Sequence, residues 1–201
     1  MSVPALSTRG LNKRFGSLVV ASDIAFELPQ GVRYALIGPN GAGKTTLFNC
    51  LSRLYTPNSG DVLFEGKSIL NRPRHDIPQI GIGRTFQNVA LFDKLSVLDN
   101  VKVGCHSRST TGFFENAIRV PKVKVEEEQI AKRSLELIDF MDLKPFTHAF
   151  AGGLPFPIRK RVELARALAS SPKLLLLDEP AAGLNHDEIE VLKGQIKRVR
   201  D

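Results

Sequence analysis

The chain has 201 residues, of which 42% are hydrophobic and 24% charged, as is typical of a globular domain. No apolar run approaches the about 20 residues that a membrane-spanning helix needs, and residues 1–6 lack a signal region. The two cysteines, Cys50 and Cys105, match no metal-binding spacing, so we expect a cytosolic chain without disulfides.

The formal net charge is +7, which favours an anionic partner. The basic residues are scattered, however, and no nucleic-acid-binding motif accompanies them, so we expect no nucleic acid partner. We interpret the excess of basic residues as a solvated basic surface. The alternative is that it places the chain near an anionic membrane surface.

The first segment, residues 3–37, is predicted to form antiparallel β-structure. Its apolar, β-prone runs Val19–Val20 and Ile24–Phe26 lie between turn residues. Phe15 precedes the first turn. An aromatic at this place either stacks on a base or fills a half-buried core position, and the pattern leaves both open.

The next segment matches the phosphate-binding pattern G-x-x-x-x-G-K-[ST] at every fixed position. It reads Gly38-Pro39-Asn40-Gly41-Ala42-Gly43-Lys44-Thr45-Thr46. The apolar run Tyr34–Ile37 before it predicts a buried parallel strand. Apolar residues at helical spacing after it predict a helix that begins near Gly43.

Strand, glycine-rich loop and helix together suit the chemistry of phosphate binding. Glycines let the backbone approach an anion closely, and the free N–H groups and the helix dipole hold it. Lys44 adds a mobile positive charge for the β- and γ-phosphates, and the Thr45 hydroxyl can ligate Mg²⁺.

Short strands and turns follow. Residues 57–70 predict a turn, a strand and a second turn, and Ile80–Gln87 predicts a strand that ends at Gln87. A lone glutamine carries little signal. At the end of a strand in a phosphate-loop protein, its amide can reach the metal or a water beside it.

Residues 89–152 have a different, helical character. Ser96 is a candidate N-cap for the run that follows it, and Val125–Phe140 is periodic enough to predict an amphipathic helix. Its predicted apolar side contains Ile130, Leu135, Leu137, Ile138 and Met141. We interpret this block as a helical insertion into an α/β core.

The last third predicts two helices around a strand. Arg159–Ser170 reads as a helix ended by Pro172, and Asp187–Arg200 as a final amphipathic helix. Between them, four leucines lead into Asp178 and Glu179. A buried strand would deliver both carboxylates to the sheet edge where ligands bind, Asp178 on the Mg²⁺ side and Glu179 as a general base.

Taken together, these residues resemble the ATP-binding subunit of ATP-binding cassette transporters over the whole chain. The phosphate loop, Gln87, a helical block, the Ala165–Leu168 helix and Leu174–Pro180 follow in the family's order. The residues at the place of the family's D-loop are Ala181-Ala182-Gly183-Leu184-Asn185. This sequence is similar to that of importers of branched-chain amino acids, urea and amides.

The resemblance implies a fold and roles for single residues. The fold is a P-loop NTPase core, residues 1–88 and 153–201, with an N-terminal antiparallel β segment and an α-helical subdomain, residues 89–152. Phe15 would stack on adenine, and Gln87 would touch Mg²⁺ and the transmembrane partner. Glu179 would be the catalytic carboxylate.

Two departures from the family pattern stand out. The signature loop, usually L-S-G-G-Q or L-P-Y-G-Q, reads Leu154-Pro155-Phe156-Pro157-Ile158, so a proline without an N–H replaces a glycine. The family's switch histidine is expected after Asp201, because His186 lies too close to Glu179. We therefore expect the C-terminal part of the family fold to be missing.

The function expected from the resemblance is ATP binding and hydrolysis that energises an importer of branched-chain amino acids or related small amides or urea. The alternative is a degenerate, non-hydrolysing subunit that binds ATP and pairs with a competent one. The expected cofactors are ATP and Mg²⁺. The expected partners are a second ATP-binding subunit, permease subunits and, indirectly, a substrate-binding protein, at the cytoplasmic face of the inner membrane.

Overall fold

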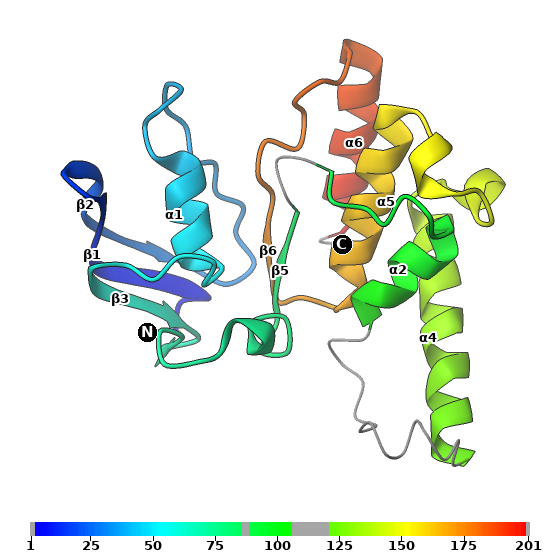
Figure 1. Ribbon diagram of the computed structural model, residues 1–201, viewed down its shortest axis with the longest axis horizontal. Helices are drawn as coiled ribbons and strands as arrows, with labels where there is room; N and C mark the ends of the chain where they lie inside the picture. The colour runs from blue at the N-terminus through cyan, green and yellow to red at the C-terminus, as the bar shows by residue number, and fades with distance from the viewer. Residues whose placement is uncertain (1–2, 86–88, 106–120, 200–201) are drawn as a thin grey trace. The chain divides into compact units, whose positions relative to one another are not determined.

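The computed structural model of the chain describes residues 3–85, 89–105 and 121–199 (Figure 1). It contains two compact units, Met1–Ile82 and Gly83–Asp201, each with its own core. Among the helices in the described ranges, none is long and apolar enough to cross a membrane.

The first unit is built on an antiparallel sheet with the strand order β2-β1-β3-β4. The strands are β1 (Leu6–Phe15), β2 (Leu18–Leu28), β3 (Ser59–Phe64) and β4 (Lys67–Ser68). β1 and β2 form a hairpin that pairs Leu6 with Leu28 at one end and Phe15 with Leu18 at the other. This confirms the predicted antiparallel segment, and the strand predicted within residues 57–70 joins the same sheet.

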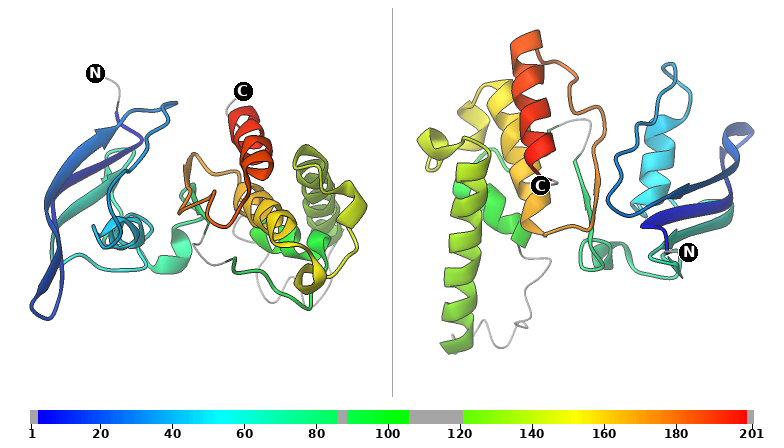
Figure 2. Two further views of the ribbon diagram at one scale, coloured as in Figure 1. Left: turned by 90° about the horizontal axis from the view of Figure 1, so that it is seen from above. Right: turned by 180° about the vertical axis from the view of Figure 1, so that it is seen from behind.

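Helix α1 (Lys44–Leu51) packs its apolar side into this unit, and the short helix η1 (Arg74–Asp76) follows β4 (Figure 2). Leu47, Cys50 and Leu51 are buried and form the contribution of α1 to the core. Burial raises the pKa of the Cys50 thiol, which keeps it uncharged.

The predicted buried strand at Tyr34–Ile37 is wrong. Residues 32–39 form no strand, and the Tyr34 and Ile37 side chains are 67% and 89% exposed. A parallel strand depends on hydrogen bonds to a neighbouring strand, and none of the four strands of the first unit pairs with this run.

The second unit contains a two-stranded sheet of β5 (Ile82–Arg84), which begins at the last residue of the first unit, and β6 (Leu174–Leu176). The Thr85 N–H donates to the Leu176 carbonyl at 3.0 Å, and Gly83 lies against Pro172. The later residue of one segment thus lies against the later residue of the other, so β5 and β6 run parallel. This confirms a strand before Asp178 and a strand within the predicted run Ile80–Gln87, and the predicted end at Gln87 lies outside the described residues.

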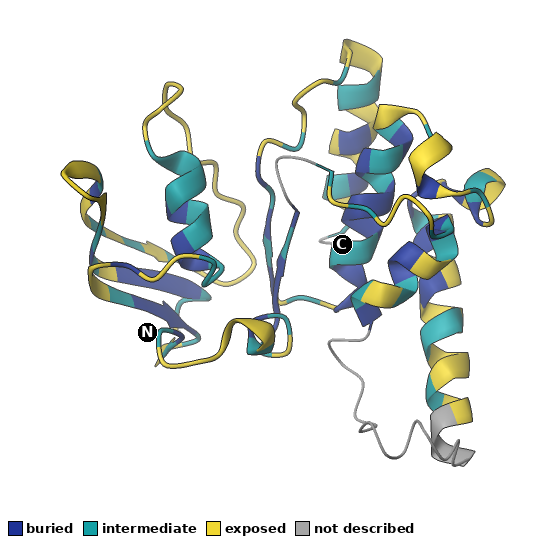
Figure 3. Ribbon diagram, in the orientation of Figure 1, coloured by how far each residue is buried: buried dark blue, intermediate teal, exposed yellow. Residues whose placement is uncertain are grey.

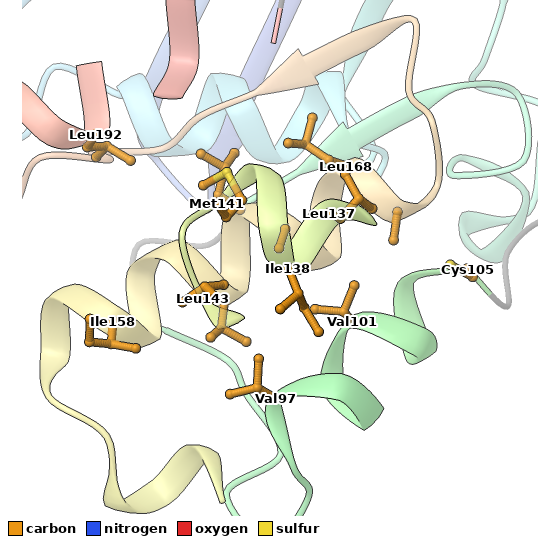
Figure 4. Packing of buried hydrophobic residues seen from close by; sticks show 14 residues of the cluster. Val97, Val101, Cys105, Leu137, Ile138, Met141, Leu143, Ile158, Leu168 and Leu192 are labelled. Atoms are coloured by element: carbon orange, nitrogen blue, oxygen red, sulfur yellow. The ribbon is translucent and has the colours of Figure 1, made fainter. Parts of the chain in front are cut away.

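Among the described residues of this unit, four helices surround a shared apolar core (Figures 3 and 4). They are α2 (Val97–Cys105), α4 (Pro121–Phe140), α5 (Phe156–Ala169) and α6 (His186–Arg198), with short helices η3 (Lys144–Phe146) and η4 (Ala151–Gly153) between α4 and α5. The Ser96 hydroxyl accepts the Asp99 N–H at 3.0 Å, which confirms Ser96 as the N-cap of α2.

The amphipathic helix predicted over Val125–Phe140 is confirmed as α4, with one exception on its apolar side. Leu137, Ile138 and Met141 are buried, but Leu135 is 46% exposed. The buried stripe passes through Ser134 instead, whose hydroxyl donates to the Ile130 carbonyl one turn earlier at 2.7 Å. A satisfied hydroxyl can therefore take a core position that the apolar pattern assigned to leucine.

Helices α2 and α4 lie inside the predicted helical subdomain, residues 89–152, and both pack on α5 beyond it. The boundaries of that subdomain stay a prediction.

Candidate functional site

The phosphate-loop residues adopt the backbone that close approach to an anion needs. Gly41 and Gly43 have φ of 82° and 80°, in the left-handed region that other residues avoid. Gly43 is the N-cap of α1, without a side-chain cap, and the first turn of the helix contains no acidic residue. The amides at the start of α1 therefore lack a protein anion of their own, and the helix dipole favours a bound one.

Gly43 also lies against the backbone of β2. A Cβ atom at this position would lie 2.6 Å from the Val20 carbonyl oxygen, closer than real side chains come. By contrast, a Cβ at Gly41 would meet nothing within 4 Å. Position 43 therefore requires glycine for two reasons, its left-handed φ and the lack of room for a side chain.

Lys44 closes the loop with its side chain. Its Nζ donates to the Gly38 carbonyl at 2.7 Å and to the Pro39 carbonyl at 2.8 Å. No carboxylate in the described part of the chain pairs with this ammonium, so its charge is available to an anion. These contacts are those that phosphate binding by Gly38–Thr46 requires, and that role stays a prediction.

Phe15 ends β1 and is 45% exposed. The Tyr55 ring meets it edge-on, with centroids 5.4 Å apart, and the Lys13 ammonium lies 4.9 Å from its centroid. Lys13 is held there by a hydrogen bond to the Thr56 carbonyl. Phe15 is therefore a positioned, partly exposed ring, as stacking on a base requires, and stacking stays a prediction.

The acidic pair follows β6 as expected. Asp178 is buried, at 4% exposure, and its Oδ2 accepts a hydrogen bond from Arg84 Nη2 at 3.0 Å. The Asp178 N–H is directed at Thr85 Oγ1, 3.4 Å away. Sequence reasoning missed Arg84. A charged residue in an otherwise apolar, glycine-containing strand was the available signal.

Glu179 has a φ of 46° although it is not a glycine and precedes Pro180. A residue before proline is normally extended, so this conformation is strained by roughly 1–3 kcal/mol. The strain marks the position that the sequence assigned to the general base.

The residues at the place of the family's signature loop, 154–158, do not form a loop throughout. Helix α5 begins at Phe156, within them. Pro155 is its N-cap and Pro157 lies in the first turn, and neither has an N–H. Ile158 and Arg159 donate their N–H groups to the Pro155 carbonyl at 3.0 and 3.1 Å. Within residues 155–159, only the Phe156 amide lacks a described acceptor.

The Phe156 ring touches the predicted D-loop. A Cβ on Gly183, whose φ is 80°, would lie 2.9 Å from Phe156 Cε1. The ammonium of the buried Lys160 lies 5.6 Å from the centre of the same ring. The structure thus places the degenerate signature stretch beside residues 181–185.

Asn185, the last residue of the predicted D-loop, has a structural role. Its side chain accepts the Glu188 N–H at 3.0 Å, and the Glu188 carboxylate accepts the Asn185 N–H at 2.9 Å. This reciprocal capping box starts α6 and fixes the end of the loop.

The side-chain oxygens expected to ligate Mg²⁺, those of Thr45, Gln87 and Asp178, are of the kind that this ion prefers. A hydroxyl, a carboxylate and an amide oxygen are hard ligands, and Asp178 Oδ1 has no hydrogen-bond donor among the described residues. Gln87, the third expected ligand, lies outside the described residues. Thr45 belongs to the first unit and Asp178 to the second, so their mutual arrangement stays a prediction.

Comparison with known proteins gives one consistent result. The family model for the ABC transporter matches residues 21–182. The branched-chain amino acid transport ATP-binding protein BraF of Pseudomonas aeruginosa is 36% identical over 200 residues, all of this chain and 78% of the relative. The corresponding LivG protein of Escherichia coli is 37% identical over 202 residues, 100% of this chain and 79% of LivG.

Solved structures agree. A nucleotide-free ATP-binding cassette from an ABC transporter superposes with a TM-score of 0.82 at 27% identity, over 100% of this chain and 78% of the other. An ATP-binding cassette in its ADP conformation gives 0.81 at 28% identity, over 100% and 77%. These likenesses confirm the expected fold class, and members of the family are ATPases coupled to transport. The chain belongs to the ABC transporter family, as an ATP-binding subunit.

Proposed function

We propose that this chain binds Mg-ATP and hydrolyses it to energise an importer of branched-chain amino acids or related small amides or urea. The geometry of the phosphate loop carries the ATP part of the proposal, since Lys44 and the start of α1 offer positive charge without a protein anion. The transport part rests on relatives such as BraF and LivG, which are named for branched-chain amino acid transport.

The residues divide the work between binding and chemistry. The amides of Gly38–Thr46 and the Lys44 ammonium hold the phosphates, and Phe15 stacks on the adenine. Thr45, Gln87 and Asp178 hold Mg²⁺, which neutralises charge on the phosphate oxygens when bound. Glu179 accepts a proton from the attacking water as a general base.

The chain works in an assembly. A second ATP-binding subunit, like or unlike, supplies the opposing half of the nucleotide site, and permease subunits anchor the pair at the cytoplasmic face of the inner membrane. A substrate-binding protein contributes indirectly by delivering the cargo.

One observation favours a second candidate, a subunit that binds ATP but completes a weak site. Pro157 removes an N–H donor from the first turn of α5, at the place where the family signature has a glycine that faces the partner's ATP. Loss of one donor to a developing anion costs about 10²–10³ in rate in other enzymes. On this account, the site completed by residues 154–158 is slow, whereas the site with Lys44, Asp178 and Glu179 is competent.

The deciding test is phosphate release from Mg-ATP by the chain assembled with its membrane and partner subunits. Glu179→Gln should abolish turnover but retain ATP binding, while Glu190→Gln, an exposed carboxylate on α6, should match wild type. If wild type and Glu179→Gln are equally silent while both bind ATP, hydrolysis at the site with Glu179 is wrong, and the chain is the non-hydrolysing ATP-binding subunit. The slow site is tested separately: if residues 154–158 slow the partner's site, Pro157→Gly should raise the turnover of the assembly above wild type.

A further inference from the structure

We propose that Arg84 is a positioning residue that compensates the buried charge of Asp178 at Oδ2 and leaves Oδ1 to Mg²⁺, so that the ion binds there only together with the nucleotide. The proposal rests on the proposed function, because it assigns Asp178 to the metal. It adds a role for a residue that the phosphate-binding and catalytic motifs do not include.

The pair is buried and well placed. Arg84 ends β5, and Asp178 follows the parallel neighbour β6 by two residues, so the side chains meet at the same end of the sheet. Arg84 Nη2 lies 3.0 Å from Asp178 Oδ2, and the two side chains are only 8% and 5% exposed. Burial this deep removes most of the water that would otherwise solvate either charge.

The contact uses only part of the carboxylate. Arginine and carboxylate commonly form two parallel hydrogen bonds, but here the described contact is made to Oδ2 alone. Oδ1 has no donor among the described residues. One oxygen is therefore held by a permanent cation, since a guanidinium does not deprotonate, and the other can face a second cation.

Charge balance distinguishes this role from a purely structural one. With Arg84 present, the buried carboxylate is compensated, and a divalent ion gains little from binding without the negative phosphates of ATP. Without Arg84, the carboxylate is buried and uncompensated, which is strongly destabilising, and a small divalent ion can replace the lost charge. A structural pair would show the same loss of stability but no response to Mg²⁺.

The test measures the midpoint of thermal unfolding, Tm, of the full chain without nucleotide, with EDTA or with 10 mM MgCl₂. Arg84→Met should lower Tm by about 10 °C in EDTA. MgCl₂ should restore at least about 5 °C of that loss, whereas wild type should shift by less than about 1 °C.

Three variants serve as controls. Arg84→Lys keeps the charge and should stay insensitive to Mg²⁺. Lys193→Met breaks an exposed ion pair with Glu190 in the same unit and should leave Tm nearly unchanged in both buffers. The double variant Arg84→Met with Asp178→Asn should lose the Mg²⁺ response, which shows that the ion acts through Asp178.

If Arg84→Met does not fold, Arg84→Gln removes the charge but keeps a hydrogen-bond donor, and the same response to Mg²⁺ is expected of it. The proposal is overturned if the neutral variants show no greater stabilisation by Mg²⁺ than wild type, or if the response survives Asp178→Asn. ATP binding by the wild-type chain is measured separately and tests the proposed function. If wild type does not bind ATP, the proposed function and the role of Arg84 are both overturned. If wild type binds ATP but the neutral variants do not respond to Mg²⁺, only the role of Arg84 is overturned.

Discussion

The three glycines of the phosphate loop should differ in their tolerance of alanine, in an order set by local geometry. At Gly38, a Cβ would have Ala42 Cβ as its nearest neighbour at 3.4 Å, and φ is not left-handed. At Gly41, a Cβ has free space but φ is 82°. At Gly43, a left-handed φ of 80° combines with a contact of 2.6 Å to the Val20 carbonyl oxygen.

These differences translate into a graded loss of ATP affinity. Alanine in the left-handed region costs about 1–2 kcal/mol, so the unbound Gly41→Ala loop should relax and must regain this φ to hold a phosphate, which weakens binding by roughly 5- to 30-fold. Gly43→Ala should in addition displace the start of α1 from β2. Together the two effects should cost about 2–4 kcal/mol of binding free energy and lower ATP affinity by at least about 30-fold. Gly38→Ala should stay within about threefold of wild type, as its contact is an ordinary one.

The assay is equilibrium binding of ATP by calorimetry, with Tm of each variant measured in parallel. Gly43→Ala should also lower Tm, because the contact with the Val20 carbonyl disturbs the start of α1 even without nucleotide. Equal losses at Gly38 and Gly43, or a Gly43→Ala variant that binds ATP like wild type, would refute the geometric reasoning.

Two further substitutions separate binding from stability. Asn185→Ala removes the capping box of α6 and should lower Tm by about 2–4 °C, with ATP affinity unchanged; an unchanged Tm would show that the cap contributes nothing. Phe15→Ala should weaken ATP binding by about 5- to 100-fold without affecting binding of inorganic triphosphate, since only the base is lost. Equal effects on ATP and triphosphate, measured by calorimetry, would place Phe15 away from the base.

Local patterns were enough to predict most of the elements. The hairpin of β1 and β2, the helices α1, α4, α5 and α6, and the leucine strand β6 each have periodicity, turn or cap signals within their own residues. The early start of α5 at Phe156 was also within reach, because proline is favoured in the first turn of a helix and Pro157 stands there.

What the sequence could not supply are features that depend on distant residues. Tyr34–Ile37 has the composition of a strand, but strand formation depends on a neighbour that composition does not name. Arg84 and Asp178 are 94 positions apart, and only the parallel pairing of β5 and β6 brings them together. Ser134 took a core position through a hydrogen bond that a hydropathy pattern does not register.

The central claim, that the Gly38–Thr46 loop binds the phosphates of ATP, is tested most directly by ATP affinity of the Lys44→Ala chain. Both hydrogen bonds of Lys44 go to exposed loop carbonyls, so its removal should leave Tm within about 2 °C of wild type. The account predicts that affinity falls by about 100-fold or more, while Lys193→Ala on α6 binds like wild type. A folded Lys44→Ala chain that binds ATP as tightly as wild type would contradict it.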